Sequence, residues 1–288
     1  MEIKQIAKIN GGQDGVIWKD QLFRFDHHGK CFVYDLLDIE GDKVKALEPI
    51  SSFVLDKAEL ITPHSNAVFW GTEFYDIGDE YPLLYSNVYN NYAHCDDKLI
   101  GVCCVYRVER AGRSFKTTLV QLLEIGFTED PFLWKAYPDR HGERPYGNFL
   151  IDRENGYYYA FVMRNEKLGT RYFKFKIPSL SEGEMSQIYG VKKVVLAPED
   201  ICCQFDCPYH RFIQGAIVHN NNIYSTEGFN NDEINRPAIR VIDLAEKNEK
   251  HCFDLLKAGC KCEPEMIDFY KGTCYYSDVY GNLYSVEF

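Results

Sequence analysis

The stretch GQDGVIWKDQLFRFD (residues 12–26) runs from polar residues into a short apolar strand, crosses the turn pair Lys19-Asp20 and returns as an aromatic strand. Four later stretches follow the same order: PHSNAVFWGTEFY (residues 63–75), PYGNFLIDRENGYYYAFV (145–162), IQGAIVHNNNIYSTEG (213–228) and EPEMIDFYKGTCYYSD (263–278). Pairs of turn residues between alternating runs are hairpin signals. The chain is therefore predicted to repeat one hairpin-based unit five times.

Further strands are predicted after each hairpin. A third strand is expected at residues 31–37, 99–110, 171–178, 238–244 and 282–288, and a fourth at residues 43–50, 116–127, 192–198 and 250–256. Four antiparallel strands per unit, repeated radially, are typical of a β-propeller. We therefore predict an all-β fold, a five-bladed β-propeller, with residues 1–288 in a single domain. A pair of aromatic-rich β-sandwiches is the alternative.

The last unit has only three strands before the chain ends at Phe288. Residues 2–9 (EIKQIAKI) alternate imperfectly between apolar and polar side chains and lie upstream of the first unit. If they paired with the outside of the last unit, the ring would close and two open sheet edges would disappear. We predict that residues 2–9 form the outer strand of the last blade.

Composition and charge exclude several classes of partner. The formal net charge is −11, and aromatic residues make up 15% of the chain, which suits half-buried strands. An acidic protein lacks the basic surface that binds nucleic acid or anionic membranes, so neither is an expected partner. No stretch approaches about 18 consecutive apolar residues, and the N-terminus does not read as a signal peptide. We therefore expect a cytoplasmic protein.

The eleven cysteines favour the same compartment, because their number is odd and many lie inside strand-like runs. A structural zinc site is an alternative, for which the candidate ligands are Cys202, Cys203, Cys207, Cys252, Cys260 and Cys262. No pair of these cysteines has the C-x-x-C spacing of a zinc site. Reduced core thiols are the favoured interpretation, and no metal or other cofactor is predicted. Walker, nucleophile-elbow, H-E-x-x-H and dinucleotide-binding motifs are absent from the sequence.

The first strand of a propeller blade lines the central channel, so the residues that open the five units are expected to gather at one channel mouth. The candidate ligand-binding residues are Gln13, His64, Asn66, Arg144, Tyr146, Asn148, His210, Arg211, Gln214 and Glu263. Amides, imidazoles, arginines and carboxylates in one place suit a polar, hydroxyl-rich ligand. The alternative is structural, since such side chains also satisfy strand ends and turns.

Asp14 and Glu265 are the candidate catalytic residues. They open the first and last units, which become neighbours when the ring closes, so their carboxylates are expected to face each other at the channel mouth. Two carboxylates that share a site raise one pKa, or recruit a cation or an arginine. If the protein is an enzyme, this pair supplies its acid and base.

The stretches IQGAIVHNNNIYSTEG (213–228) and EPEMIDFYKGTCYYSD (263–278), with the ending GNLYSVEF (281–288), resemble the five-bladed propellers of teichoic-acid biosynthesis proteins and phage receptor-binding proteins. The resemblance covers the last quarter of the chain and implies a saccharide or polyol-phosphate ligand. Propeller glycosidases such as arabinanases use three carboxylates on different blades. Asp14 matches the first, but the openings of blades two to four carry His64 and Asn66, Asn148, and Gln214 instead.

Three functions fit these features. The leading one is recognition of a small polar or saccharide ligand at the channel mouth. The second is a glycosidase or lyase acting on a glycan, for which Glu263 or Glu265 would have to supply the second carboxylate. The third is a non-catalytic protein-interaction scaffold.

Overall fold

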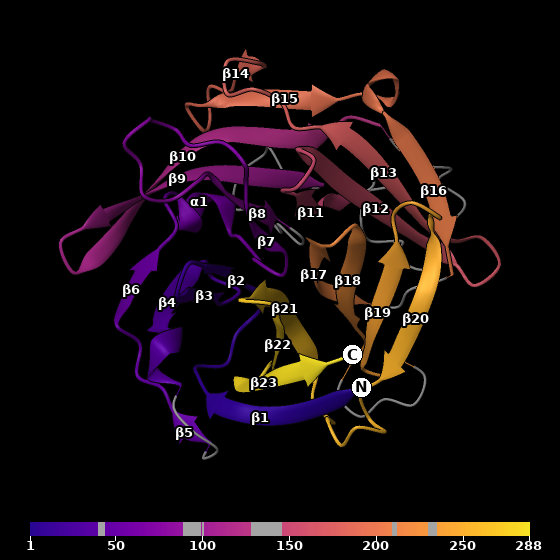
Figure 1. Ribbon diagram of the computed structural model, residues 1–288. Coiled ribbons are helices and arrows are strands. Elements are labelled where there is room, and N and C mark those ends of the chain that lie inside the picture. Colours follow the sequence, from indigo (N-terminus) through magenta and orange to yellow (C-terminus); the bar gives the residue numbers. More distant parts are fainter. Residues whose placement is uncertain (40–43, 89–98, 100, 128–145, 209–211, 230–234) are drawn as a thin grey trace.

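The structure is a computed structural model that describes residues 1–39, 44–88, 99, 101–127, 146–208, 212–229 and 235–288. The described strands form five sheets arranged around a central axis (Figure 1). The innermost strands are β2 (Gly15–Trp18), β7 (Val68–Trp70), β11 (Tyr146–Asp152), β17 (Ile213–His219) and β21 (Pro264–Tyr270). Each of them contacts the innermost strands of the two neighbouring blades. The predicted five-bladed β-propeller is confirmed.

The outer strands follow in order from the axis outward. Blade 1 continues with β3 (Gln21–Phe25), β4 (Lys30–Asp35) and β6 (Ser51–Val54), and blade 2 with β8 (Leu84–Val88), β9 (Val102–Ala111), β10 (Ser114–Ile125), β15 (Lys192–Leu196) and β14 (Glu184–Met185). Blade 3 adds β12 (Tyr157–Asn165), β13 (Gly169–Lys176) and β16 (Cys203–Cys207), and blade 4 adds β18 (Asn222–Glu227), β19 (Ala238–Asp243) and β20 (Asn248–Asp254). Blade 5 adds β22 (Thr273–Asp278), β23 (Asn282–Glu287), β1 (Glu2–Lys8) and β5 (Lys45–Ala46).

Two of the turn pairs that predicted hairpins have two consecutive residues of positive φ. Asn220 and Asn221 both have positive φ angles, 49° and 58°, between β17 and β18. Lys271 and Gly272 repeat this between β21 and β22, with φ angles of 50° and 82°. Two consecutive residues of positive φ match the right-handed twist of the strands they join, and Asn and Gly adopt that conformation at low cost.

The core lies in layers between neighbouring blades, so a middle strand is buried on both faces. In β9, Cys103 and Val105 face the layer shared with blade 3, whereas Val102, Cys104 and Tyr106 face the layer shared with blade 1. Successive side chains of a strand point to opposite faces of the sheet, and in β9 each face packs against an apolar layer. It explains why thiols occur inside apolar runs: Cys31, Cys103, Cys104, Cys207, Cys260 and Cys274 are buried free thiols.

The N-terminal strand closes the ring as predicted. β1 pairs antiparallel with β23, from Glu2 opposite Glu287 to Lys8 opposite Asn282, and the two termini lie side by side (Figure 1). The side chain of Gln5 donates to that of Asn282 at 3.1 Å. The first and last segments of the chain therefore belong to one blade.

The predicted fourth strand at residues 43–50 is wrong. Of residues 44–50, which the structure describes, only Lys45–Ala46 is a strand, and it pairs in parallel with β1 of blade 5. The fourth strand of blade 1 is β6, whose Phe53 packs edge-on against Phe23 and Phe25. Leu47, by contrast, is buried in the layer between blades 5 and 1. The segment that joins blade 1 therefore contributes an aromatic side chain to the layer between blades 1 and 2.

The predicted fourth strand at residues 192–198 is a strand, but it belongs to a different blade. β15 pairs in parallel with the last five residues of β10 in blade 2, while β16 pairs with β13 in blade 3. Both segments are five residues long, so their length does not tell which edge each one covers. Since β10 is the fourth strand of blade 2, its outer edge is available and β15 pairs with it.

Helical structure is scarce in the described residues. The α-helix α1 (Ala58–Ile61) covers one turn between blades 1 and 2. No helix in the described part of the chain is long and apolar enough to cross a lipid bilayer.

Candidate functional site

Five of the predicted site residues gather at the N-terminal ends of three innermost strands. They come from blade 1 (Gln13 and Asp14), blade 4 (Gln214) and blade 5 (Glu263 and Glu265), and together they are called the start-side cluster. Blades 4, 5 and 1 are consecutive around the ring. Residues that are far apart in the sequence thus meet because each one opens a blade.

Two glutamate–glutamine pairs join neighbouring blades in this cluster. The amide of Gln214 donates to Oε1 of Glu263 at 2.6 Å. The amide of Gln13 donates to Oε1 of Glu265 at 3.4 Å. The two carboxylates of the EPE sequence are therefore each held by an amide from a flanking blade, one from blade 4 and one from blade 1.

Glu265 is the most unusual member of the cluster. Only 1% of its surface is exposed, and its Oε2 has no hydrogen-bond partner among the described residues. Burial raises the pKa of this carboxyl well above its usual range, and the charge of Glu263 raises it further. A buried carboxyl oxygen without a partner normally calls for a water or a ligand group.

Asp14 is equally buried but fully engaged. Its Oδ1 accepts from the backbone N–H of Gly15 and its Oδ2 from that of Val68, both at 2.8 Å. Since Val68 begins β7, this carboxylate links blade 1 to blade 2. Burial raises the pKa of Asp14 well above its usual range, against the effect of the two backbone hydrogen bonds.

Gly215 explains how three blades approach so closely. A Cβ at this position would lie 2.6 Å from the carbonyl oxygen of Glu265 and 3.0 Å from Oδ1 of Asp14. Both distances are too short for a side chain, so glycine lets β17 pass between them. Asp14 and Glu265 therefore flank one residue of blade 4, and the charge of Asp14 contributes to the raised pKa of Glu265.

Arg24, in β3, was missed by the sequence analysis. It is completely buried, and its Nη2 donates to the carbonyl oxygens of Gly12 at 2.9 Å and Asp278 at 3.0 Å. Its Nε and Nη1 have no partner among the described residues. Its positive charge acts most strongly on Glu265 and then on Asp14. The available signal was an arginine inside the otherwise apolar strand QLFRF, since a charge there must have a buried counter-charge.

On blade 2, the predicted Asn66 forms a structural pair. Its side-chain oxygen accepts from the amide of Asn87 at 2.7 Å, and the side-chain oxygen of Asn87 accepts from the backbone N–H of Ala67 at 3.1 Å. Asn66 is buried, whereas His64, two residues earlier, is partly exposed. The role of Asn66 in binding stays a prediction, and its observed contacts fasten the start of β7.

The remaining predicted residues lie wholly or partly outside the described part of the chain. Arg144, His210 and Arg211 are outside the described residues. Tyr146 and Asn148 belong to β11 by their backbone, but their side chains are not described.

The sequence matches no model of a known protein family, and no curated protein is similar to it. Solved structures that are similar in backbone include the following three. A glutaminyl cyclase of Myxococcus xanthus is 12% identical, with a TM-score of 0.49 over 100% of this chain and 94% of that one. Sqt1 of Saccharomyces cerevisiae is 6% identical (TM-score 0.38, 92% and 54% covered), and the WD40 β-propeller domain of Doa1 is 12% identical (TM-score 0.39, 98% and 96% covered). Similarities at this level carry no information about ligand or reaction.

Proposed function

We propose that the protein binds a small polar ligand, a saccharide or polyol, at the start-side cluster. The observation that carries the proposal is Oε2 of Glu265, a buried carboxyl oxygen with no partner among the described residues. The other oxygen of Glu265 accepts from the amide of Gln13, and the neighbouring half-buried Glu263 accepts from the amide of Gln214. A ligand hydroxyl can both donate to such an oxygen and accept from an amide, so hydroxyl groups suit this set.

The test is a thermal-shift screen of monosaccharides, disaccharides and polyols against the wild type and Glu265→Gln. A ligand that binds only the folded protein raises its melting temperature. We expect at least one compound to raise it for the wild type and to lose that effect in E265Q. The amide has nearly the shape of a protonated carboxyl, so the variant should fold. Glu287→Gln, an exposed change of the same kind, should retain the shift.

Two results would overturn the binding proposal. One is a wild-type protein whose melting temperature responds to no member of the panel. The other is a shift that is equal in E265Q and the wild type, because the ligand would then occupy a different site.

A glycosidase or lyase is the second candidate, and the raised pKa of Glu265 favours it, because a general acid must hold a proton near neutral pH. Asp14 remains the proposed partner, although both of its oxygens accept backbone hydrogen bonds. Incubation with a glycan panel tests this candidate. Product formation that falls about 10²–10⁴-fold in E265Q would support it, and no product with any glycan would exclude it for that panel.

A further inference from the structure

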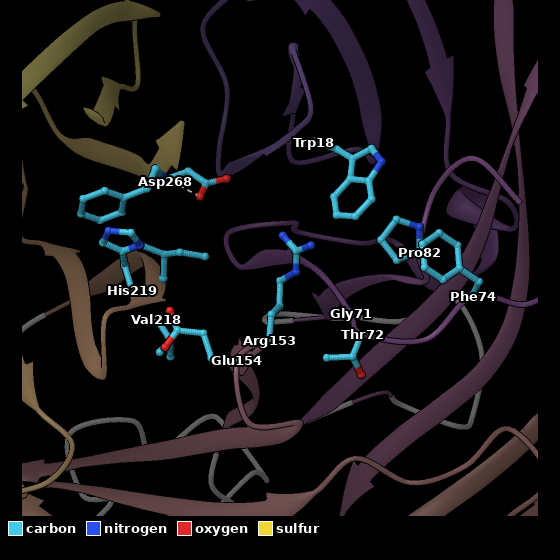
Figure 2. A pocket seen from close by; sticks show the side chains of 12 residues that line it. Trp18, Gly71, Thr72, Phe74, Pro82, Arg153, Glu154, Val218, His219 and Asp268 are labelled. Atoms are coloured by element: carbon cyan, nitrogen blue, oxygen red, sulfur yellow. Dashed lines mark hydrogen bonds between the residues drawn. The ribbon is translucent and has the colours of Figure 1, made fainter. Parts of the chain in front are cut away.

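A hollow lies at the ends of the innermost strands opposite the start-side cluster. It has a volume of about 390 Å³ and is lined by residues from the ends of β2, β17 and β21 and from the segments that follow β7 and β11. Its lining includes Trp18, Phe74, Arg153, His219, Asp268 and Phe269, and this hollow is called the end-side pocket (Figure 2). Trp18 lies four residue steps beyond Asp14 along the chain, about 13 Å of extended strand.

Arg153 reaches into the middle of the end-side pocket from the turn after β11 (Figure 2). Its guanidinium carbon lies 4.7 Å from the centre of the Trp18 ring. No carboxylate or carbonyl among the described residues forms an ion pair or hydrogen bond with it. The ring holds the guanidinium by a cation–π contact, while its N–H donors stay available.

Aromatic rings form the walls on both sides of the guanidinium. Trp18 and Phe74 pack edge to face at 6.4 Å, and Phe74 is 43% exposed. Across the pocket the imidazole of His219 stacks on Phe269, with ring centres 3.9 Å apart and planes inclined by 15°. Flat apolar surfaces that flank a charged group suit a ligand with a flat apolar body and one ionised substituent.

Two acidic residues line the same pocket, and both are already engaged. Asp268 accepts from the backbone N–H of Ile17 at 2.6 Å and of Phe269 at 2.7 Å. Burial raises its pKa to about 6, against the effect of its two backbone hydrogen bonds and of the charge of Arg153. Glu154 accepts from the backbone N–H of Asn220 at 3.1 Å. The guanidinium is therefore the group with the most unused hydrogen-bonding capacity in the pocket.

We propose that the end-side pocket binds a small carboxylate whose flat apolar body lies against the aromatic walls while Arg153 holds the carboxylate. A guanidinium offers two parallel N–H donors that match the two oxygens of a carboxylate. The walls supply the apolar contact, and the volume falls in the range of pockets for small molecules, about 300–1,000 Å³. The proposal is independent of ligand binding at the start-side cluster.

The experiment is calorimetric titration of the full chain with benzoate, with benzyl alcohol and inorganic phosphate as comparison compounds. We expect benzoate to bind, benzyl alcohol to bind at least tenfold more weakly because it lacks the charge, and phosphate to bind more weakly because it lacks the ring. Arg153→Gln should weaken benzoate binding at least tenfold, and Phe74→Ala should weaken it severalfold. Arg153→Lys should fall in between, since lysine keeps the charge but loses the paired donors.

The control is Arg236→Gln, which removes another exposed arginine, one that is paired with Asp254, and it should bind benzoate like the wild type. Equal affinity of the wild type and R153Q for benzoate would overturn the proposal, as would benzyl alcohol or phosphate binding as tightly as benzoate. Absence of benzoate binding at millimolar concentration would overturn it as well. Glu265→Gln should leave benzoate binding unchanged, so failure here is distinguishable from failure at the start-side cluster.

Discussion

Arg24 and Arg153 stand at opposite ends of the innermost strands and differ in almost every physical respect. Arg24 is completely buried, donates to two carbonyl oxygens and lies among buried carboxylates. Arg153 is exposed, and its guanidinium lies over the face of Trp18. Burial therefore makes the first arginine part of the framework, while exposure leaves the second free to meet a ligand. The same residue type has two roles because the two ends differ in their access to water.

The largest expected effect concerns the closed ring on which both ends depend. Deletion of residues 1–8 removes β1, which covers β23 and fills two inter-blade layers with Ile3, Ile6 and Ala7. The open edge of β23 would then be available for aggregation. We expect the truncated chain to lose its cooperative thermal transition, measured by circular dichroism, and to bind neither class of ligand.

The matched control for the deletion is Lys8→Ala, which keeps the strand and changes an exposed side chain. It should melt like the wild type. A truncated chain that is as soluble and heat-stable as the full chain would contradict closure by the N-terminal strand.

The second-largest expected effect is a difference in the free energy of unfolding between variants of the two arginines. Arg24→Met should lower the free energy of unfolding by about 3–5 kcal/mol at pH 8, because it leaves buried carboxylates without their counter-charge. Arg153→Met should change it by less than about 0.5 kcal/mol, as is usual for exposed positions. Urea denaturation measures both. Equal losses in the two variants would mean that burial does not distinguish the two ends.

The smallest expected effect is the pH dependence contributed by Glu265. Its pKa is raised in the folded protein, so the folded state holds this proton more tightly than the unfolded chain does. The stabilisation is complete below the ordinary glutamate pKa and is lost as the pH rises through the raised one. A tenfold difference in proton affinity between the two states is worth about 1.4 kcal/mol. Urea denaturation at several pH values should therefore show E265Q gaining stability over the wild type between pH 4 and pH 8, and a constant difference would refute the raised pKa.

The repeated order of polar opening, short strand, tight turn and aromatic strand predicted the fold, and four of the five blades follow it. Blade 2 differs, because the thirteen residues 71–83 separate β7 from β8 and the aromatic stretch at residues 72–75 is not a strand. The repeated order follows from the two-residue period and from turn pairs such as Asn220-Asn221, which are local properties. The outer strands are different. Residues 43–50 and 192–198 were assigned to the wrong sheet edges, because the pattern of a short strand does not identify the edge that the strand covers. The edge depends on contacts between segments far apart in the sequence, such as those of Phe53 in β6 and the pairing of β15 with β10.

The candidate sites also contain residues that the sequence predicted and residues that it did not. The meeting of Gln13, Gln214, Glu263 and Glu265 was predictable, since residues that open the blades converge once the ring closes. Arg24 was not predicted, because it reaches the cluster from a second strand by the length of its side chain. The end-side pocket was not predicted either. Its residues end the strands rather than begin them, and they share no common sequence pattern.

The most direct test of the two-ended account is a crossed binding experiment on the wild type, Glu265→Gln and Arg153→Gln. Each is titrated with benzoate and with whichever saccharide or polyol gives the largest thermal shift. The account predicts that E265Q loses the saccharide or polyol and keeps benzoate, whereas R153Q loses benzoate and keeps the saccharide or polyol. The account would be contradicted if one variant lost both ligands, or if both variants bound both ligands as the wild type does.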